Sequence, residues 1–125
     1  PLTLLLGDLS LLHDLNSLKL IYESPKPIVL VVLNNHGGGI FSFLPVSEHK
    51  DIFETYFSTP HSLEFKDAAK MFKLLYFHPE SPEEFESIYL KQTSADKSCI
   101  IEVNTLKEDN IRVQEEWTEF LHQNR

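Results

Sequence analysis

The hydrophobic residues of this chain gather in short runs, separated by segments with helical periodicity. Residues 2–6 (Leu-Thr-Leu-Leu-Leu) and 28–33 (Ile-Val-Leu-Val-Val-Leu) are apolar almost throughout. Neither run alternates apolar with polar positions, which is the pattern of parallel strands buried on both faces of a sheet. Two further short runs, 74–77 and 99–103, are also predicted as strands.

Between these runs, apolar residues recur at the spacing of helices. Leucines at positions 11, 15 and 18, followed by Tyr22, predict one helix over about residues 10–22, which the next prolines would stop. Residues 65–72 follow the i, i+3, i+4, i+7 pattern of a second helix. Ser81, Pro82 and Glu84 predict the start of a third helix, with Ser81 as N-cap and Glu84 completing a capping box.

The remaining segments are less regular. Residues 39–64 are rich in aromatic side chains but show no clear period. Because a structureless loop of this length is unusual in a compact domain, we expect one or two short helices there, around residues 51–57, covering a site. The charged residues 104–110 are expected to connect to a last helix, whose apolar stripe consists of Val113, Trp117, Phe120 and Leu121.

The alternation of strands and helices predicts an α/β fold, with a mostly parallel sheet covered by helices on both faces. The length of 125 residues suits a single domain. Because an apolar run begins at the second residue, we expect residues 1–125 to form one partial domain, truncated on its amino-terminal side, as a piece of a larger protein.

Charge and cysteine content narrow the class of protein. Eleven Lys and Arg against nineteen Asp and Glu give a net charge of −8, which disfavours non-specific binding to nucleic acids or anionic membranes. Cys99 is the only cysteine, so an internal disulfide is excluded, and we expect it to be a buried, unreactive strand residue. No apolar run is long enough to span a membrane.

Glycine and oxygen-bearing side chains follow the first two predicted strands. Gly7-Asp8 follows one strand, and Asn34-Asn35-His36-Gly37-Gly38-Gly39 follows the next. Both clusters should lie at the carboxyl edge of a parallel sheet, where such sheets bind ligands. The Asp8 carboxylate, the Asn35 carbonyl and the turn backbone suit Mg²⁺, with further ligands from phosphate groups. Alone, Asp8 could equally be a helix N-cap.

The spacing of these clusters resembles a known motif. Gly7-Asp8, a gap of 25 residues and Asn34-Asn35 are similar to the diphosphate-binding motif of thiamine diphosphate-dependent enzymes, except that Leu9 replaces the usual glycine. Together with the block Gly37-Gly-Gly-Ile-Phe-Ser and residues 65–76, this motif most resembles the 2-succinyl-5-enolpyruvyl-6-hydroxy-3-cyclohexene-1-carboxylate synthase family, over about residues 4–103.

The resemblance implies thiamine diphosphate and Mg²⁺ as cofactors, and decarboxylation of 2-oxoglutarate with addition of the succinyl unit to isochorismate. It implies that Asp8, Asn35 and the Gly37 carbonyl ligate Mg²⁺, and that Ile40, Phe41 and Leu44 form an apolar wall. The other cofactor-binding residues that it implies are Gly7, Leu9, Ser10 and Gly38. The activating glutamate is expected in another domain, outside this chain, so that the chain alone would be inactive.

The resemblance also implies a homo-oligomer, a dimer or tetramer. Some features look like the plant enzyme of phylloquinone synthesis, which would place the protein in the chloroplast; a bacterial menaquinone enzyme would be cytoplasmic. Two alternatives remain. The chain could be a non-catalytic remnant that serves as an interaction module, or it could belong to another thiamine diphosphate decarboligase, such as an acetolactate synthase relative.

Overall fold

Four parallel strands form a single sheet. The computed structural model describes residues 2–123, apart from the side chains of residues 107, 108 and 115. Its strands are β1 (Leu2–Gly7), β2 (Ile28–Asn34), β3 (Leu75–Phe77) and β4 (Cys99–Asn104), in the order β1-β2-β4-β3. The four predicted strands are confirmed, and three of them extend one residue beyond their apolar runs, to Gly7, Asn34 and Asn104.

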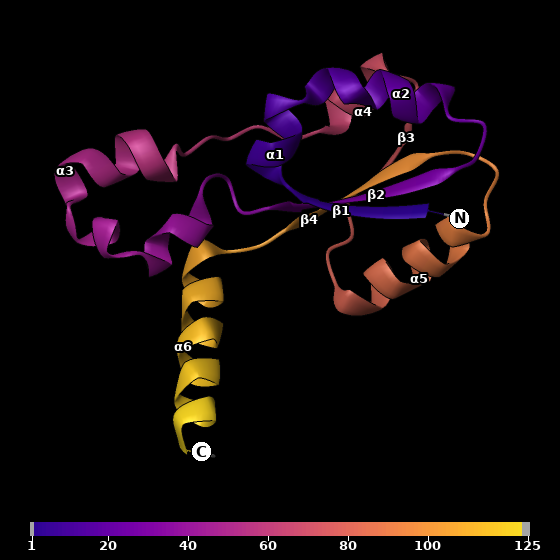
Figure 1. The fold of residues 1–125 in the computed structure, drawn as a ribbon. Coiled ribbons are helices and arrows are strands. Elements are labelled where there is room, and N and C mark those ends of the chain that lie inside the picture. Colours follow the sequence, from indigo (N-terminus) through magenta and orange to yellow (C-terminus); the bar gives the residue numbers. More distant parts are fainter. Residues whose placement is uncertain (1, 124–125) are drawn as a thin grey trace. The chain divides into compact units, whose positions relative to one another are not determined.

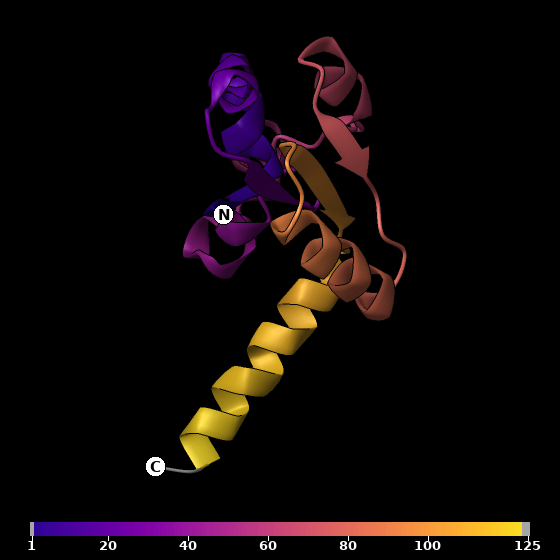
Figure 2. The same ribbon diagram turned by 90° about the vertical axis from the view of Figure 1, so that its right-hand side faces the viewer.

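Helices cover both faces of this sheet, as Figures 1 and 2 show. Helices α1 (Asp8–His13), α2 (Leu18–Glu23) and α4 (Lys66–Met71) pack on the face that carries Leu30, Val32 and Ile100. Helix α5 (Pro82–Thr93) packs on the other face, against Val29, Val31 and Ile101. Alternate residues of β2 therefore enter opposite cores, which explains why its run is apolar throughout and confirms the predicted α/β fold.

The single helix predicted over residues 10–22 is wrong. Helix α1 begins earlier, at Asp8, and ends at His13, because Asp14 leaves the helical conformation (φ −127°, ψ 42°). The Asp14 carbonyl accepts hydrogen bonds from the amide and the hydroxyl of Ser17, at 3.0 and 2.7 Å. Local bonds of this kind compete with the helical ladder, so a 3₁₀ turn at Leu15–Ser17 separates α1 from α2.

Helix α5 begins where its sequence predicted. The Ser81 hydroxyl accepts the Glu84 amide at 3.1 Å, which confirms the N-cap. The Glu84 carboxylate, however, accepts the amide of Glu80 at 2.8 Å, one residue before the position that a capping box would use.

The aromatic segment and the carboxyl-terminal part are mostly helical. Residues 39–58 form 3₁₀ turns at Gly39–Phe43 and Pro45–Glu48, then α3 (Lys50–Phe53), which runs into a π turn at Glu54–Ser58. The expected short helices are thus confirmed. The connection expected over residues 104–110 is wrong, since α6 (Lys107–Gln123) begins inside it. Arg112 pairs with Asp109 and Glu116 at 3.2 and 3.3 Å, and pairs at this spacing favour a helix.

These elements form two compact units. The sheet unit comprises residues 1–34 and 62–104, and the helical unit comprises residues 35–61 and 105–125. The chain therefore passes between the units after Asn34, before Ser62 and after Asn104. That the whole chain acts as one partial domain stays a prediction.

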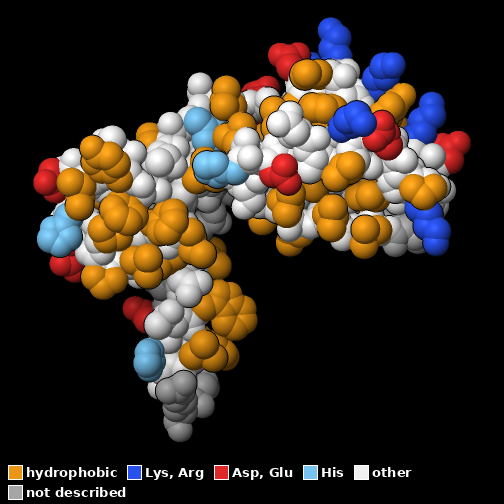
Figure 3. All heavy atoms as spheres, turned by 45° about the horizontal axis from the view of Figure 1, so that its top comes forward, with side chains coloured by type: hydrophobic (Ala, Val, Ile, Leu, Met, Phe, Trp, Pro, Cys, Tyr) orange, Lys and Arg blue, Asp and Glu red, His pale blue; other side chains and the backbone are white. Residues whose placement is uncertain are grey.

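Hydrophobic side chains of the helical unit remain exposed, and Figure 3 shows them gathered on one face. The apolar stripe predicted for α6 is present, and the rings of Trp117 and Phe120 lie 6.0 Å apart within it. None of the described helices is long and apolar enough to cross a membrane. The exposed large side chains of this unit are Ile40, Phe43, Leu44, Ile52, Tyr56, Leu106, Val113, Trp117, Phe120 and Leu121.

Candidate functional site

The carboxyl ends of β1 and β2 bring Asp8 and Asn34 to one edge of the sheet. Gly7 is level with Leu33 in the strand pairing; Asp8 follows Gly7 as the first residue of α1, and Asn34 follows Leu33 as the last residue of β2. Asp8 is only 3% exposed, and its Oδ1 accepts the Leu9 amide at 2.7 Å. The N-cap of α1 is Gly7, so the alternative role of Asp8 as an N-cap is wrong. A buried carboxylate at the ligand-binding edge of the sheet remains.

The other residues of the first motif differ in exposure. Gly7 and Ser10 are exposed, whereas Leu9 is half-buried. A Cβ added at Gly7 would meet no other atom within 4 Å, and the Gly7 backbone is extended. Packing within the described residues therefore does not require glycine at position 7. The space beside Gly7 is open, and a ligand could occupy it.

The two adjacent asparagines have different surroundings. Asn34 is fully buried, and its Nδ2 donates to the Leu63 carbonyl at 2.9 Å and to Glu102 Oε1 at 2.6 Å. In the helical unit, Asn35 Oδ1 is buried and has no hydrogen-bond partner among the described residues. An unsatisfied buried oxygen costs free energy, and a cation would satisfy it. This contrast fits the prediction that Asn35, and not Asn34, is the metal ligand.

The glycine turn is shaped by the backbone at Phe57 and Ser58. Gly37 has φ +147°, and a Cβ there would collide with the Ser58 carbonyl. A Cβ on Gly38 would collide with the Phe57 carbonyl, and the Gly38 amide donates to the Ser58 carbonyl at 2.7 Å. These glycines are therefore needed for packing inside the helical unit, a reason that the sequence did not reveal.

Two further features of the turn concern the Gly37 carbonyl and the Asn35 side chain. The Gly37 carbonyl accepts the Gly39 amide at 3.0 Å, and a carbonyl oxygen has a second lone pair that can bind a cation. A Cβ on Gly39 would collide with Asn35 Nδ2, so this glycine leaves room for the Asn35 side chain. The Asn35 and Gly37 oxygens thus fit a hard cation such as Mg²⁺.

The residues predicted as an apolar wall lie in the helical unit. Phe41 is half-buried, and its ring lies edge-on to that of Phe57 at 5.9 Å. Ile40 is 71% exposed and Leu44 is 48% exposed. Within this unit, Phe41 contributes to packing, whereas Ile40 and Leu44 present free apolar surface.

Among the described residues, no group of three or more His, Cys, Asp or Glu side chains could hold a metal ion. Asp8 belongs to the sheet unit, and Asn35 belongs to the helical unit.

Glu102 is the residue of this region that sequence reasoning missed. It is fully buried in β4, and its carboxylate accepts hydrogen bonds from Asn34 Nδ2, the Phe65 amide and the Tyr76 hydroxyl, at 2.6, 2.8 and 2.8 Å. Burial and the hydrogen bond to Glu102 raise the pKa of Tyr76, so its hydroxyl stays a proton donor. The feature of the sequence that could have identified Glu102 is the single glutamate within the apolar run Cys-Ile-Ile-Glu-Val.

Cys99 lies at the start of the same strand and is fully buried, as expected. Burial raises the pKa of its thiol to about 11. The thiolate, which is the reactive form, is therefore disfavoured near neutral pH, and Cys99 is excluded as a nucleophile.

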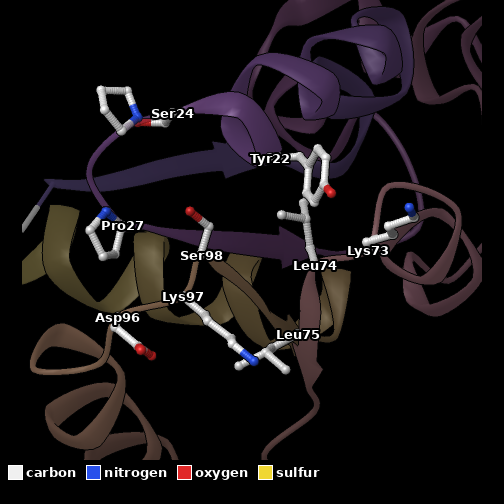
Figure 4. A pocket seen from close by; sticks show the side chains of 10 residues that line it. Tyr22, Ser24, Pro27, Lys73, Leu74, Leu75, Asp96, Lys97 and Ser98 are labelled. Atoms are coloured by element: carbon white, nitrogen blue, oxygen red, sulfur yellow. The ribbon is translucent and has the colours of Figure 1, made fainter.

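Two hollows lie in the sheet unit away from the motif residues. One, of about 360 Å³, opens at the amino ends of β2, β3 and β4, between Tyr22, Lys73 and Lys97 (Figure 4). Lys73 Nζ lies 5.8 Å from the centre of the Tyr22 ring. The other, of about 470 Å³, is lined mainly by apolar side chains of β1, β2 and α5, including Leu5 and Phe85. Neither contains a residue of the first motif or of the glycine turn.

Comparisons with known proteins agree with this arrangement. Solved structures of similar fold include benzoylformate decarboxylase from Polynucleobacter necessarius, with a TM-score of 0.68 and 19% identity over 86% of this chain and 20% of that one. A thiamine diphosphate-dependent 4-hydroxybenzoylformate decarboxylase from Rhodococcus jostii has a TM-score of 0.66 and 22% identity, over 83% of this chain and 19% of that one. The fold is thus that of a domain of thiamine diphosphate-dependent decarboxylases.

Curated relatives narrow the class to one family, although no family model matches. The 2-succinyl-5-enolpyruvyl-6-hydroxy-3-cyclohexene-1-carboxylate synthase of Chlorobium phaeobacteroides is 51% identical over 111 residues, which are 89% of this chain and 19% of that protein. The synthase of Rubrobacter xylanophilus is 50% identical over 116 residues, 93% of this chain and 20% of that protein. The chain belongs to this synthase family, and it spans about a fifth of the length of these relatives.

Proposed function

We propose that this chain binds the Mg²⁺-diphosphate part of thiamine diphosphate, within a synthase that decarboxylates 2-oxoglutarate and adds the succinyl unit to isochorismate. The observation that carries the cofactor site is the buried, unpartnered Asn35 Oδ1, in a chain that also buries the Asp8 carboxylate. The membership in the synthase family supports the reaction.

The chain's own residues would hold the metal and the diphosphate. Asp8 and Asn35 would ligate Mg²⁺ through side-chain oxygens, and Gly37 through its carbonyl. Gly7, Leu9, Ser10 and Gly38 would lie against the diphosphate, where a missing or small side chain lets the backbone approach phosphate oxygens. Ile40, Phe41 and Leu44 would lie beside the apolar part of the cofactor and exclude water there. When bound, thiamine diphosphate supplies the carbanion chemistry of decarboxylation and carbon–carbon bond formation.

The acid–base partner of the cofactor is expected outside these 125 residues, on a glutamate of another domain, in a dimer or tetramer. Without that domain the site stays open to water, which weakens each polar contact to the cofactor. We therefore propose that the isolated chain binds the cofactor weakly and turns over no substrate.

The pathway and location depend on the source of the chain. A bacterial protein would serve menaquinone synthesis in the cytoplasm, and a plant protein would serve phylloquinone synthesis in the chloroplast. The relatives named above are bacterial. The membership in the synthase family supports small-molecule substrates, and the net charge of −8 disfavours non-specific binding to nucleic acids.

A hybrid synthase tests this proposal. In it, the 111 matching residues of this chain replace their counterparts in the Chlorobium phaeobacteroides enzyme. The assay is CO₂ release from 2-oxoglutarate in the presence of isochorismate, Mg²⁺ and thiamine diphosphate. We expect turnover by the hybrid and none by the isolated chain. A folded hybrid without turnover would support a non-catalytic remnant, and acetolactate formation from pyruvate would support another decarboligase. Turnover by the isolated chain, at the rate of an intact synthase, would contradict the proposed division between domains.

A further inference from the structure

We propose that Glu102 is a positioning residue for the metal-binding turn, acting through Asn34. The inference rests on the proposed function for the identity of the ligand but not for its structural basis. That basis is the buried carboxylate of Glu102 and the three segments of the chain that donate to it.

Two of the three donors, and Glu102 itself, lie near places where the chain passes between the two units. Asn34 is the last residue of the sheet unit before the chain enters the helical unit at Asn35. Phe65, whose amide donates to Glu102 Oε2 at 2.8 Å, follows closely on the return at Ser62. Glu102 itself lies two residues before Asn104, where the chain leaves the sheet unit again.

Asn34 connects these places directly. Its Nδ2 bridges Glu102 Oε1 and the carbonyl of Leu63, at 2.6 and 2.9 Å. One carboxylate and one amide therefore tie together the departure of the chain after Asn34 and its return at Leu63 and Phe65. The Tyr76 hydroxyl adds a third donor, from the edge strand β3.

The network is costly to break because it is buried. Glu102, Asn34 and Phe65 are each at most 1% exposed, so a lost partner is not replaced by water. The network lies next to the residues that it would position. Asn35, the proposed metal ligand, is bonded to Asn34 through one peptide, and Gly37 follows two residues later. Holding Asn34 in one rotamer limits the directions in which that peptide can leave β2.

The test compares Glu102→Gln with Ser98→Ala. Gln offers one acceptor oxygen where the carboxylate offers two, so at least one donor of the network loses its partner. Ser98 lies just before the opposite end of β4, where its hydroxyl accepts the Ile28 amide at 3.0 Å and donates to the Ile21 carbonyl at 3.3 Å. Ser98→Ala therefore breaks two hydrogen bonds in the same unit, far along the strand from the turn.

The first measurement is amide hydrogen exchange in the 125-residue chain, which needs no ligand. The Gly38 amide donates to Ser58 and the His61 amide donates to His36, at 2.7 and 3.1 Å, so both report on the order of the turn segment. We expect Glu102→Gln to raise their exchange rates at least tenfold relative to Ser98→Ala. Asn34→Ala cuts the same link from its other end and should act alike, which keeps the test decisive if Glu102→Gln does not fold.

The second measurement is the Mg²⁺ dependence of thiamine diphosphate binding in the hybrid synthase, followed by calorimetry. We expect Glu102→Gln to weaken the apparent Mg²⁺ affinity at least tenfold, and we expect saturating concentrations of Mg²⁺ to restore cofactor binding in this variant. Ser98→Ala should leave the Mg²⁺ affinity unchanged. Equal exchange rates and equal Mg²⁺ affinities in the two variants would overturn the positioning role. If the wild-type hybrid binds no cofactor, the proposed function fails, and the exchange measurement alone decides whether Glu102 orders the turn.

Discussion

Asn34 Nδ2 lies 2.6 Å from Glu102 Oε1, although 68 positions separate the two residues in the sequence. In the pairing of β2 with β4, Val32 is level with Glu102 and Asn34 is level with Asn104. The Glu102 side chain therefore reaches diagonally along the sheet, to the residue two positions further on the neighbouring strand. Diagonal neighbours on one face of a sheet are within reach of long side chains. This pair ends the apolar core at the edge of the sheet where the proposed metal ligands follow.

Replacing the only charged ligand should remove cofactor binding. We expect Asp8→Ala in the hybrid synthase to abolish thiamine diphosphate binding, because the other proposed ligands are uncharged oxygens. Calorimetric titration in the presence of Mg²⁺ measures this. Asp14→Ala is the matched control, since Asp14 is an exposed carboxylate just after α1, and it should keep the wild-type affinity. Undiminished affinity in Asp8→Ala would refute the site.

The two asparagines should differ in their contribution to stability. Asn35→Leu removes the Asn35 oxygen at similar size, and we expect at least a tenfold loss of Mg²⁺ affinity, which corresponds to about 1.4 kcal/mol. Asn34→Leu removes the donor to Glu102 Oε1 and to the Leu63 carbonyl, and should lower the free energy of unfolding by about 1–3 kcal/mol. Calorimetry and urea denaturation measure the two effects. A loss of Mg²⁺ affinity from Asn34→Leu alone, with Asn35→Leu unchanged, would show that the wrong asparagine has been assigned.

Two glycines offer a matched pair for the cost of a methyl group. Gly37→Ala places a Cβ against the Ser58 carbonyl at φ +147°, and we expect a loss of about 1–3 kcal/mol in the free energy of unfolding. Gly7→Ala meets no atom within 4 Å, at an ordinary φ of −82°, so the free energy should change by less than about 0.5 kcal/mol. Urea denaturation of the isolated chain checks both values. Equal destabilisation would mean that the turn does not pack as described.

Cys99 predicts a pH dependence of stability. Burial raises the pKa of its thiol from 9.0 to about 11, so above pH 9 the unfolded chain loses a proton that the folded chain retains. The free energy of unfolding should therefore be constant with respect to this group below pH 9, and should fall as the pH rises toward 11. Denaturation at pH 8 and between pH 9 and 10, compared with Cys99→Ala, isolates the effect, because Tyr76 in the unfolded chain ionises only near pH 10. A wild-type slope no steeper than that of Cys99→Ala would be inconsistent with a buried thiol.

The sequence predicted the sheet better than the polar contacts beneath its edge. Runs such as residues 28–33 identify strands because both faces are buried, and turn residues directly after a strand locate a ligand-binding edge. The hydrogen bonds of Glu102 could not be predicted, since its partners Asn34, Phe65 and Tyr76 come from three separate segments of the sequence. The strand order brings these segments together, and the sequence of no single segment determines that order.

Local competition was equally hard to predict. The leucines at 11, 15 and 18 keep helical spacing across Asp14, yet the hydrogen bonds from Ser17 to the Asp14 carbonyl break the helix there. The glycine turn was predicted to serve a ligand. The sequence could not show that the backbone of residues 57–58 lies against this turn and leaves no room for a Cβ at Gly37 or Gly38.

The strand order β1-β2-β4-β3 has a consequence for the time course of folding. Strands β1 and β2 are synthesised before β3 and β4, and they can pair while those two strands are still being made. Strand β3 is made next, but its only neighbour in the described sheet is β4, which ends at Asn104. Strand β4 is therefore the last of the four strands to be synthesised, and it must enter between β2 and β3, which are already present. Pairing β2 with β4 closes a loop of about 65 residues, and late long-range pairing of this kind slows folding and leaves strand edges exposed to other chains in the meantime.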